Sequence, residues 1–357
     1  MPYDRTATLK DSLVPHNVAL IGYGYAGKTF HAPLILAEPG LRLTAVVSSD
    51  PAKVHADLPK MRVEADIATV LADPAIDLVV IATPNDSHAP LAHAAVAADK
   101  AVVVDKPLAL TLQDARLIAA HAAEKGTLLS VFHNRRWDGD FLTIANAIEQ
   151  GVIGKVAHFE SHFDRFRPVV RDRWRENPGP GSGVWADLGP HLVDQVLCLF
   201  GQPTRVIASL GALRDGARTD DWAHVVLEFP DMRCVLHAGM LVAGGSPRFI
   251  VHGSEGSLIK HGLDPQEAQL LEGLRPGAPD WGQEDTPLTR YEAEGQTHPL
   301  TVHPGDYPAF YAGIAMALDG APLAVTAEQA LAVMAVVEAA TESARTGTAQ
   351  PVPPFRL

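Results

Sequence analysis

The chain has 357 residues, of which 47% are hydrophobic and 20% charged, the ordinary balance of a globular protein whose length suggests two domains. Its formal net charge of −13 argues against a nucleic-acid partner, because phosphate contacts need clustered Lys and Arg. The sequence has no apolar stretch of about 20 residues and no signal-peptide h-region, so we expect a cytoplasmic protein without a membrane span.

In the first third of the chain, short apolar runs alternate with helix-like stretches rich in Ala and Leu. The runs lie at 18–21, 43–47, 78–82, 101–104 and 128–132. Near-continuous apolar strands separated by helices predict a parallel sheet covered on both faces. We therefore expect an α/β fold that opens with a doubly wound Rossmann domain over residues 1–135.

The first run is followed by a glycine motif. Its sequence is Gly22-Tyr23-Gly24-Tyr25-Ala26-Gly27, which has the spacing GxGxxG. Alone, this motif could be a plain tight turn. Here it lies between a predicted strand and a predicted helix, where the glycines let backbone amides approach a pyrophosphate at the helix N-terminus. The motif thus predicts a dinucleotide cofactor.

The end of the second strand bears on which dinucleotide binds. NAD enzymes place an acidic residue there for the ribose 2′-hydroxyl, whereas this chain has Ser48 and Ser49, with Lys53 nearby. Hydroxyls and an ammonium group favour a 2′-phosphate, so we expect NADP, with NAD possible. Asp50 leaves two alternatives: it is the NAD-type acid after a small shift in register, or it caps the next helix.

Polar residues follow three of the later strands. Lys106 follows the strand at 101–104, and similar segments end the neighbouring strands. A lone Lys in such a place is usually solvated, but ligands of open α/β sheets bind at the carboxyl ends of the strands. We assign to the cofactor site Thr83, Pro84, Asn85, His88, Asp105, Lys106, Asn134 and Arg135.

After residue 135 the pattern changes to alternating strands joined by turns. We expect strands at 155–164, 206–213, 224–229, 233–240 and 248–251 and a closing helix at 327–344 capped by Thr326. On the first of these strands His158, Glu160, His162 and Asp164 share one face, and Ala157, Phe159 and Phe163 share the other. Residues 136–357 are thus predicted to form an α+β domain with a large, open, mostly antiparallel sheet, for substrate binding and oligomerisation.

A second polar constellation lies at 187–194. Pro190 is best tolerated in a first helical turn, so we expect a helix from Asp187 to Phe200. Asp187, His191 and Asp194 are then spaced four and three apart on one helix face. A His flanked by carboxylates is oriented and made more basic, which suits a general base for an alcohol proton.

Two other interpretations of this constellation stay open. Asp187 could simply cap the helix, or the three residues could bind a metal. We expect no metal, because a single His and no Cys contribute. Cys198 and Cys234 lie far apart in apolar surroundings, which predicts buried thiols in a reducing compartment.

Three separated motifs resemble the Gfo/Idh/MocA family of oxidoreductases: the glycine motif, Asp105-Lys106-Pro107 and Asp-x-Gly-x-His-x-x-Asp at 187–194. Most members have Glu-Lys-Pro at the second motif, one methylene longer than Asp-Lys-Pro. Other segments look like the branch that contains NADP-dependent scyllo-inositol dehydrogenases. They are VFHNRRWD at 131–138, RFRP at 165–168, RWRE at 173–176, PRF at 247–249, HG at 252–253 and GDY at 305–307.

The resemblance implies roles for the matching residues. Lys106 corresponds to the active-site lysine, and Asp187 and His191 correspond to the catalytic pair. The substrate-contacting positions that it implies are His162, Asp164, Arg165, Asp194 and Tyr307. Related sequences often carry Asn in place of Asp164, which leaves the identity of the polyol open.

The residues and the resemblance together predict an NAD(P)-dependent dehydrogenase or reductase of a polyol or sugar such as scyllo-inositol, with its site between the two domains. His191 accepts the hydroxyl proton, Lys106 stabilises the developing alkoxide, and Asp187 orients them. One alternative is another sugar or sugar-derived ketone as substrate, and another is an NADP-sensing regulator without catalysis. An open sheet face also predicts a homodimer or a dimer of dimers.

Overall fold

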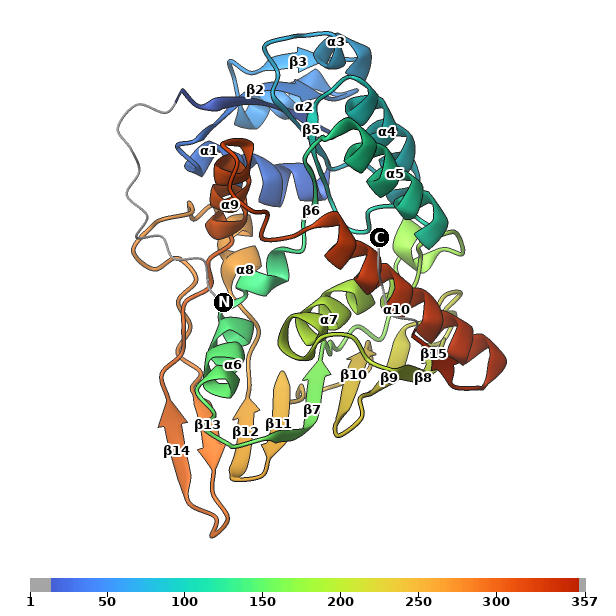
Figure 1. Ribbon diagram of the computed structural model, residues 1–357, viewed down its shortest axis with the longest axis vertical. Helices are drawn as coiled ribbons and strands as arrows, with labels where there is room; N and C mark the ends of the chain where they lie inside the picture. Colours follow the sequence, from blue (N-terminus) through green and yellow to red (C-terminus); the bar gives the residue numbers. More distant parts are fainter. Residues whose placement is uncertain (1–13, 353–357) are drawn as a thin grey trace. The chain divides into compact units, whose positions relative to one another are not determined.

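The computed structural model describes residues 14–352, which form two compact units (Figure 1). The first unit runs to Trp137 and also includes the segments Pro265–Gly282 and Asp306–Ala330. The second unit comprises Asp138–Asp264, Gln283–Gly305 and, among the described residues, 331–352. The first boundary thus lies two residues from the expected one, at 137 rather than 135. The two later segments of the first unit were not expected from the sequence.

The first unit contains a six-stranded parallel sheet in the order β3-β2-β1-β4-β5-β6. This is the strand order of a Rossmann domain, which confirms the prediction. The strands are β1 (His16–Ile21), β2 (Leu41–Val47), β3 (Arg62–Glu64), β4 (Leu78–Ile81), β5 (Ala101–Val104) and β6 (Leu129–Val131). Every residue of β4 and β5 is buried, as apolar strands between two helical layers should be.

Helical segments surround this sheet. They are η1 (Gly27–His31), α1 (Ala32–Ala37), α2 (Pro51–Asp57), α3 (Ile67–Leu71), η2 (Asn85–Ser87), α4 (His88–Ala97), α5 (Leu112–Lys125), η3 (Asn134–Trp137), α8 (Gln266–Leu271) and α9 (Pro308–Leu318).

The second unit contains, within residues 14–352, a nine-stranded sheet in the order β14-β13-β12-β11-β7-β10-β9-β8-β15. Its neighbours are antiparallel except β7 and β10, so the prediction of an open, mostly antiparallel sheet is confirmed. The strands are β7 (Val156–His162), β8 (Arg205–Gly211), β9 (Trp222–Glu228), β10 (Arg233–Gly239), β11 (Phe249–Gly253), β12 (Gly256–Lys260), β13 (Leu288–Tyr291), β14 (Thr297–Leu300) and β15 (Gln350–Pro351). The helical segments are α6 (Gly139–Glu149), η4 (Trp174–Glu176), α7 (Val184–Phe200) and α10 (Ala327–Thr346).

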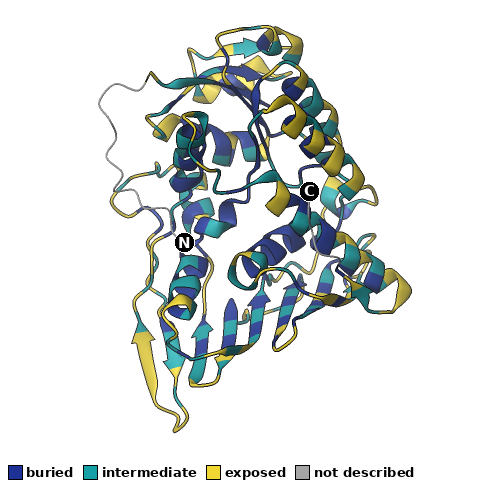
Figure 2. Ribbon diagram, in the orientation of Figure 1, coloured by how far each residue is buried: buried dark blue, intermediate teal, exposed yellow. Residues whose placement is uncertain are grey.

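The two faces of this sheet differ in polarity. One face, called the inner face here, packs under α7, and its core includes Phe159, Phe163 and Leu236 together with Leu188 and Leu192 of the helix. The other, called the outer face, carries the alternate side chains of the same strands. The central strands therefore alternate between buried and partly exposed residues, whereas β14 is largely exposed (Figure 2).

The helix α7 differs from the sequence prediction at its start. It begins at Val184, so Pro190 lies in its interior and Asp187 is not its N-cap. The position before Val184 is Gly183, with a φ of 97° that favours glycine. The helix ends at Phe200 before Gly201, as expected. The predicted cap of α10 is confirmed, because Gln329 N donates to Thr326 Oγ1 at 3.3 Å.

The two cysteines have different surroundings. Cys234 is buried on the inner face, and burial raises the pKa of its thiol to about 12. Cys198 is exposed, contrary to the expectation of two buried thiols.

In the described part of the chain, none of the helices combines the length and the hydropathy that crossing a membrane would require.

Candidate active site

The three glycines of the GxGxxG motif occupy different surroundings. A Cβ on Gly22 would lie 2.6 Å from the carbonyl oxygen of Ala82, and one on Gly27 would lie 2.2 Å from that of Gly22. These two glycines are needed for the tight turn and for close packing. A Cβ on Gly24 would have no heavy atom within 4 Å. The open side of the turn is therefore at Gly24, where a dinucleotide motif lets the pyrophosphate approach.

The two tyrosines of the motif point to different partners. Tyr23 is buried and its hydroxyl donates to Asp57, 3.3 Å away. Tyr25 is half exposed and its hydroxyl donates to Glu267 at 2.7 Å. Arg135, one of the predicted cofactor residues, donates to the other oxygen of Glu267 at 2.9 Å. Glu267 on α8 thus joins the glycine turn to the end of β6. Glu267 could not be predicted from the sequence, because no motif surrounds it.

The carboxyl ends of β4 and β5 are joined by a histidine. His88 is fully buried, with Nδ1 2.7 Å from the carbonyl oxygen of Pro107 and Nε2 3.0 Å from that of Thr83. Both ring nitrogens therefore face the backbone. His88 braces the loops that carry Thr83 and Lys106, which is a different role from the cofactor contact that we predicted.

Lys106 follows β5, as predicted, and its backbone N donates to the Asp105 carboxylate at 2.8 Å. Near Asp105, His31 and Tyr311 form a buried pair with 2.6 Å between Nδ1 and the hydroxyl oxygen. Burial lowers the pKa of His31 to about 4, although the charge of Asp105 opposes this change. Burial also raises the pKa of Tyr311 well above its ordinary value, and Asp105 adds to that effect. This pair is therefore neutral near pH 7.

The turn after β2 resolves the role of Asp50. Its carboxylate accepts a hydrogen bond from Lys53 N at 3.0 Å and caps α2. The backbone N of Asp50 donates to Ser48 Oγ at 3.1 Å. Of the two alternatives for Asp50, the structure therefore shows the helix cap. Ser49 and Lys53 are exposed near the end of β2.

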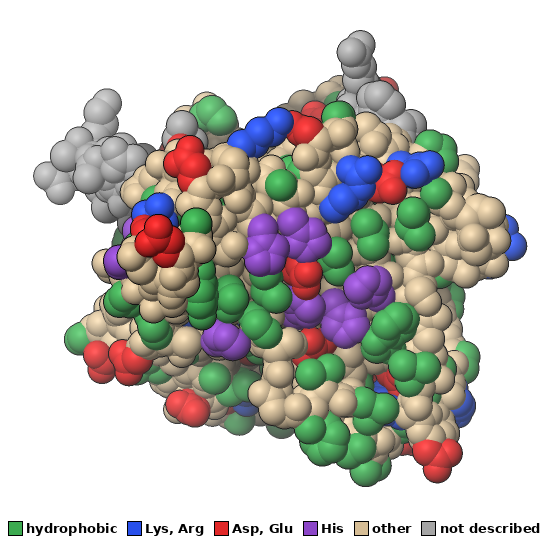
Figure 3. Space-filling model, turned by 90° about the horizontal axis from the view of Figure 1, so that it is seen from below, with side chains coloured by type: hydrophobic (Ala, Val, Ile, Leu, Met, Phe, Trp, Pro, Cys, Tyr) green, Lys and Arg blue, Asp and Glu red, His purple; other side chains and the backbone are tan. Residues whose placement is uncertain are grey.

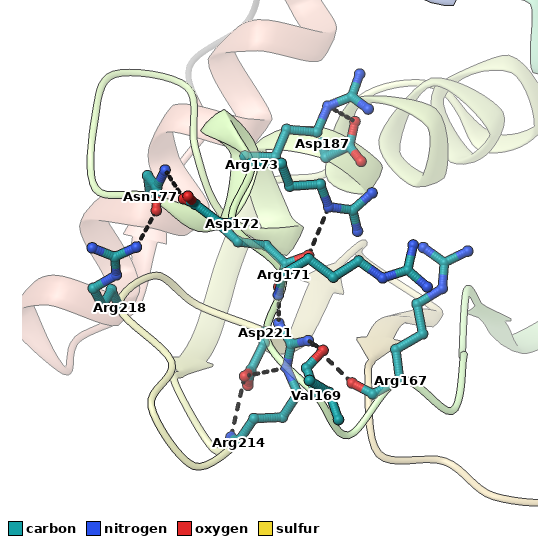
Figure 4. Close-up of polar contacts among 12 residues, drawn as sticks. Arg167, Val169, Arg171, Asp172, Arg173, Asn177, Asp187, Arg214, Arg218 and Asp221 are labelled. Atoms are coloured by element: carbon teal, nitrogen blue, oxygen red, sulfur yellow. Dashed lines mark hydrogen bonds and ion pairs between the residues drawn. The ribbon is translucent and has the colours of Figure 1, made fainter.

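The second unit carries the predicted catalytic pair on α7. Asp187, His191 and Asp194 recur at helical spacing, and His191 is 7% and Asp194 2% exposed. Asp187, which is labelled in Figure 4, is less buried and forms an ion pair with Arg175, whose Nε lies 3.4 Å from Oδ1. The helix geometry thus places an imidazole and carboxylates on one side of α7.

The structure does not bring all predicted substrate residues to that helix. His162 and Asp164 belong to the outer face of the sheet, on the side away from α7. Arg165 follows them, with its guanidinium over the ring of Phe163 at 5.3 Å. Tyr307 is fully buried in the core of the first unit. Within the second unit, the sheet separates His162 and Asp164 from His191.

His162 instead belongs to a group of five histidines on the outer face. The rings of His162 and His237 are 5.6 Å apart, and those of His237 and His224 are 5.7 Å apart, in cross-strand register. The other two histidines are His158 and His252, with centroids 5.7 Å apart. Histidines gather with acidic side chains on this surface (Figure 3). Residues 14–352 contain no group of three or more His, Cys, Asp or Glu arranged to hold a metal ion.

Two family models match most of the chain. Residues 16–133 match the NAD-binding Rossmann fold of the GFO_IDH_MocA oxidoreductase family. Residues 145–353 match the C-terminal alpha/beta domain of the same family.

Several known proteins are similar over nearly their whole length. The uncharacterized oxidoreductase YdgJ of Escherichia coli is 54% identical over 92% of this chain and 96% of its own. The scyllo-inositol 2-dehydrogenase (NADP(+)) IolW of Bacillus subtilis is 37% identical over 92% of this chain and 93% of its own. A solved structure from Klebsiella pneumoniae has a TM-score of 0.91 and 55% identity, covering 96% of this chain and 97% of that one.

Proposed function

Because the chain belongs to the Gfo/Idh/MocA family of NAD(P)-dependent oxidoreductases, we propose that it transfers a hydride between NADP and a polyol or sugar of the scyllo-inositol kind. The observation that carries this proposal is that each unit supplies part of the chemistry. The first unit has an open glycine turn and Lys106, and the second has Asp187 and His191 on one helix. The name of the relative IolW supports both the substrate class and the cofactor.

The cofactor would be held by the first unit. Gly22, Gly24 and Gly27 form the pyrophosphate turn, and the bound nicotinamide supplies the hydride acceptor or donor. The remaining residues that we propose for this site are Tyr23, Tyr25 and Ala26 through their backbone, Ser48, Ser49, Lys53, Thr83, Pro84, Asn85, Asp105, Lys106, Asn134 and Arg135.

The proton chemistry would be carried by three side chains. His191 takes the proton from the reacting hydroxyl, and Lys106 stabilises the negative charge that develops on its oxygen. Asp187 orients these groups, and Asp194 accepts a hydrogen bond from a further substrate hydroxyl. The same groups run carbonyl reduction in reverse, because they act on the oxygen in both directions. Another sugar or sugar-derived ketone would use the same machinery.

The variant Lys106→Met tests this assignment. We expect it to lose most turnover while its affinity for NADPH stays within a few-fold, because Lys106 acts on the substrate oxygen. Absorbance of reduced nicotinamide, with both cofactors against a panel of inositols and aldoses, measures turnover, and fluorescence titration measures affinity. A variant that loses NADPH binding by orders of magnitude yet turns over normally when saturated would show that the role is wrong.

The cofactor preference has its own test. We propose that NADP(H) binds more tightly than NAD(H), because Ser48, Ser49 and Lys53 stand where an acidic residue would repel the 2′-phosphate. Ser48→Asp should shift the preference toward NAD by adding negative charge at that position. Equal or tighter binding of NADH by the wild-type protein contradicts the proposal.

We also propose that the chain assembles as a homodimer or a dimer of dimers through the outer face of the nine-stranded sheet. Ile207 is exposed on this face. Histidine side chains also gather on it (Figure 3). An open sheet face is a natural surface for a second copy. Sedimentation of the purified protein measures the mass of the assembly, and a monomer at all concentrations would contradict it.

A further inference from the structure

The loop between β7 and α7 is anchored by a buried arginine. Arg214 is 7% exposed, and its Nε donates to Asp221 at 2.8 Å while Nη2 donates to Glu176 at 3.1 Å (Figure 4). Its Nη1 donates to the carbonyl oxygen of Arg167 at 3.0 Å. Breaking this arrangement would leave a buried charge without its partner, which is strongly destabilising. The loop is therefore fixed at its base.

The same network fixes the residues just before α7. Glu176 accepts hydrogen bonds from the backbone N of Arg171 at 2.9 Å and from Nε of Arg173 at 2.7 Å, in addition to Arg214. Burial would raise the pKa of Glu176, but these hydrogen bonds and the charge of Arg214 outweigh it and lower the pKa. The ionised carboxylate of Glu176 thus holds several parts of the loop together through its hydrogen bonds.

The first turn of α7 is tied to this loop and to Asp220. The backbone N of Gly183 donates to the carbonyl oxygen of Arg175 at 2.9 Å, and that of Trp185 donates to the Asp220 carboxylate at 2.7 Å. A Cβ at Gly183 would lie 1.9 Å from Asp220 Oδ1, so the position requires glycine. The turn that carries Asp187 is consequently fixed relative to Arg175.

Arg175 is placed to act on Asp187. Its Nε lies 3.4 Å from Asp187 Oδ1, and its guanidinium lies over the ring of Trp174 at 5.1 Å. The Asp187 carboxylate also lies in the first turn of α7, where the aligned backbone amides favour negative charge.

We propose that Arg175 is a positioning residue that holds Asp187 in the orientation required for turnover. The proposal rests on the proposed function, because it needs Asp187 in the catalytic site. Arg175 does not touch the substrate in this role. It acts through the Asp187 carboxylate, whose misplacement by about 1 Å can cost on the order of 100-fold in rate.

The experiment compares Arg175→Ala with Arg171→Ala as its matched control. Both variants remove one arginine side chain from the same loop. The side chain of Arg171 is exposed, and Arg171 contacts Glu176 through its backbone N, which the substitution keeps. We expect Arg175→Ala to lower kcat by roughly 10- to 100-fold with little change in KM. Arg171→Ala should stay within a few-fold of wild type. Added guanidinium should restore part of the activity of Arg175→Ala.

A double-variant cycle with Asp187→Asn decides whether Arg175 acts through Asp187. If it does, Arg175→Ala adds little further loss of kcat once Asp187 has been replaced. The proposal is overturned if the losses of kcat from Arg175→Ala and Asp187→Asn multiply in the double variant. It is also overturned if Arg175→Ala keeps a kcat as close to wild type as that of Arg171→Ala. Failure of the proposed function can be distinguished from failure of this proposal, because the wild-type protein would then turn over none of the inositols and aldoses. In that case the same four proteins still test the pairing by their free energies of unfolding, and zero coupling overturns it.

Discussion

The two faces of the nine-stranded sheet are made by the same strands but carry different chemistry. On the inner face, Phe159 and Leu236 pack in the core beneath α7. On the outer face, His162 and His237 face each other from β7 and β10. Histidine and aspartate occur on both sides of the sheet, since α7 carries Asp187, His191 and Asp194.

This difference shows that residue type alone does not assign a side chain to a site. His162 and His191 are both histidines beside carboxylates, and both were candidates for the same substrate. The period of two along β7 sends His162 to the side opposite Phe159, and therefore away from α7. Topology separates the two histidines, so they should respond very differently to substitution.

The largest expected effect is on turnover. His191→Asn should lower the rate of alcohol oxidation by roughly 10²–10⁴-fold, the usual contribution of a positioned general base, because Asn has no titrating nitrogen. It should also flatten the rise of the rate with pH. The matched variant His162→Asn on the outer face should stay within a few-fold of wild type. Steady-state rates over a range of pH measure both.

Thermal unfolding serves as the control for this pair. If His191→Asn unfolds earlier but keeps near-wild-type turnover and an unchanged pH profile, His191 is structural and Lys106 becomes the next candidate for the base. Loss of turnover in His162→Asn with unchanged assembly would mean that the outer face does reach the substrate.

The second effect is on stability. Phe159→Ala should lower the free energy of unfolding by about 3–5 kcal/mol, because the fully buried ring packs under α7 and its loss leaves a cavity. In a single copy of the chain, Ile207→Ala on the outer face should change it by only about 0.5 kcal/mol, since Ile207 is 42% exposed before any assembly. Urea unfolding of both variants measures the difference. Equal losses would mean that the outer face is buried in the assembly to a similar degree.

Local patterns were enough to predict the Rossmann unit. The strands β4 and β5 are continuous apolar runs, β1 ends in one, and the glycine motif directly follows β1. The short edge strand β3 was missed, because Arg62 and Glu64 give it no apolar run. In the second unit β12 to β15 were missed for similar reasons, and Pro299 and Pro351 lie within two of them.

What the sequence could not show depends on contacts between distant segments. His88 and Tyr307 follow polar or motif-like segments, yet both are buried, because the loop at Pro107 contacts His88 and Phe30 packs against the ring of Tyr307. The Asp220 carboxylate accepts a hydrogen bond from Trp185 N and caps α7 from a separate loop, so the helix begins at Val184 and Pro190 lies in its interior. Glu267 meets Tyr25 and Arg135 only after a segment distant in sequence folds with the first unit.

The smallest expected effect is the pH dependence of stability on the outer face. Burial would lower the pKa of His162, but the Asp164 carboxylate 3.6 Å from Nδ1 and the hydrogen bond to Glu160 outweigh burial and raise it above the ordinary value of 6.5. Burial would likewise raise the pKa of Asp164, but the nearby His162 ring and the hydrogen bond from Ser246 lower it below 3.8. The stabilisation of the folded protein by His162 is therefore fully present below pH 6.5 and is lost as the pH rises through its folded pKa. The stabilisation of the folded protein by Asp164 is present above pH 3.8 and is lost as the pH falls through its folded pKa.

His162→Gln should therefore destabilise the protein more at about pH 5.5 than at about pH 8.5, by on the order of 1 kcal/mol or less in the free energy of unfolding. His237 works in the opposite direction, because burial lowers its pKa and its protonation weakens the fold as the pH falls. The charge of His162 is one of the causes that lower the pKa of His237, so His162→Gln also changes the titration of His237. The same comparison in a His237→Gln background isolates the contribution of His162. In an Asp164→Asn background the pH-dependent difference should shrink, because the carboxylate that favours the protonated ring is gone. Equal destabilisation at both pH values would show that the pKa of His162 does not change on folding, and that the outer face differs from the inner face in polarity but not in its response to pH.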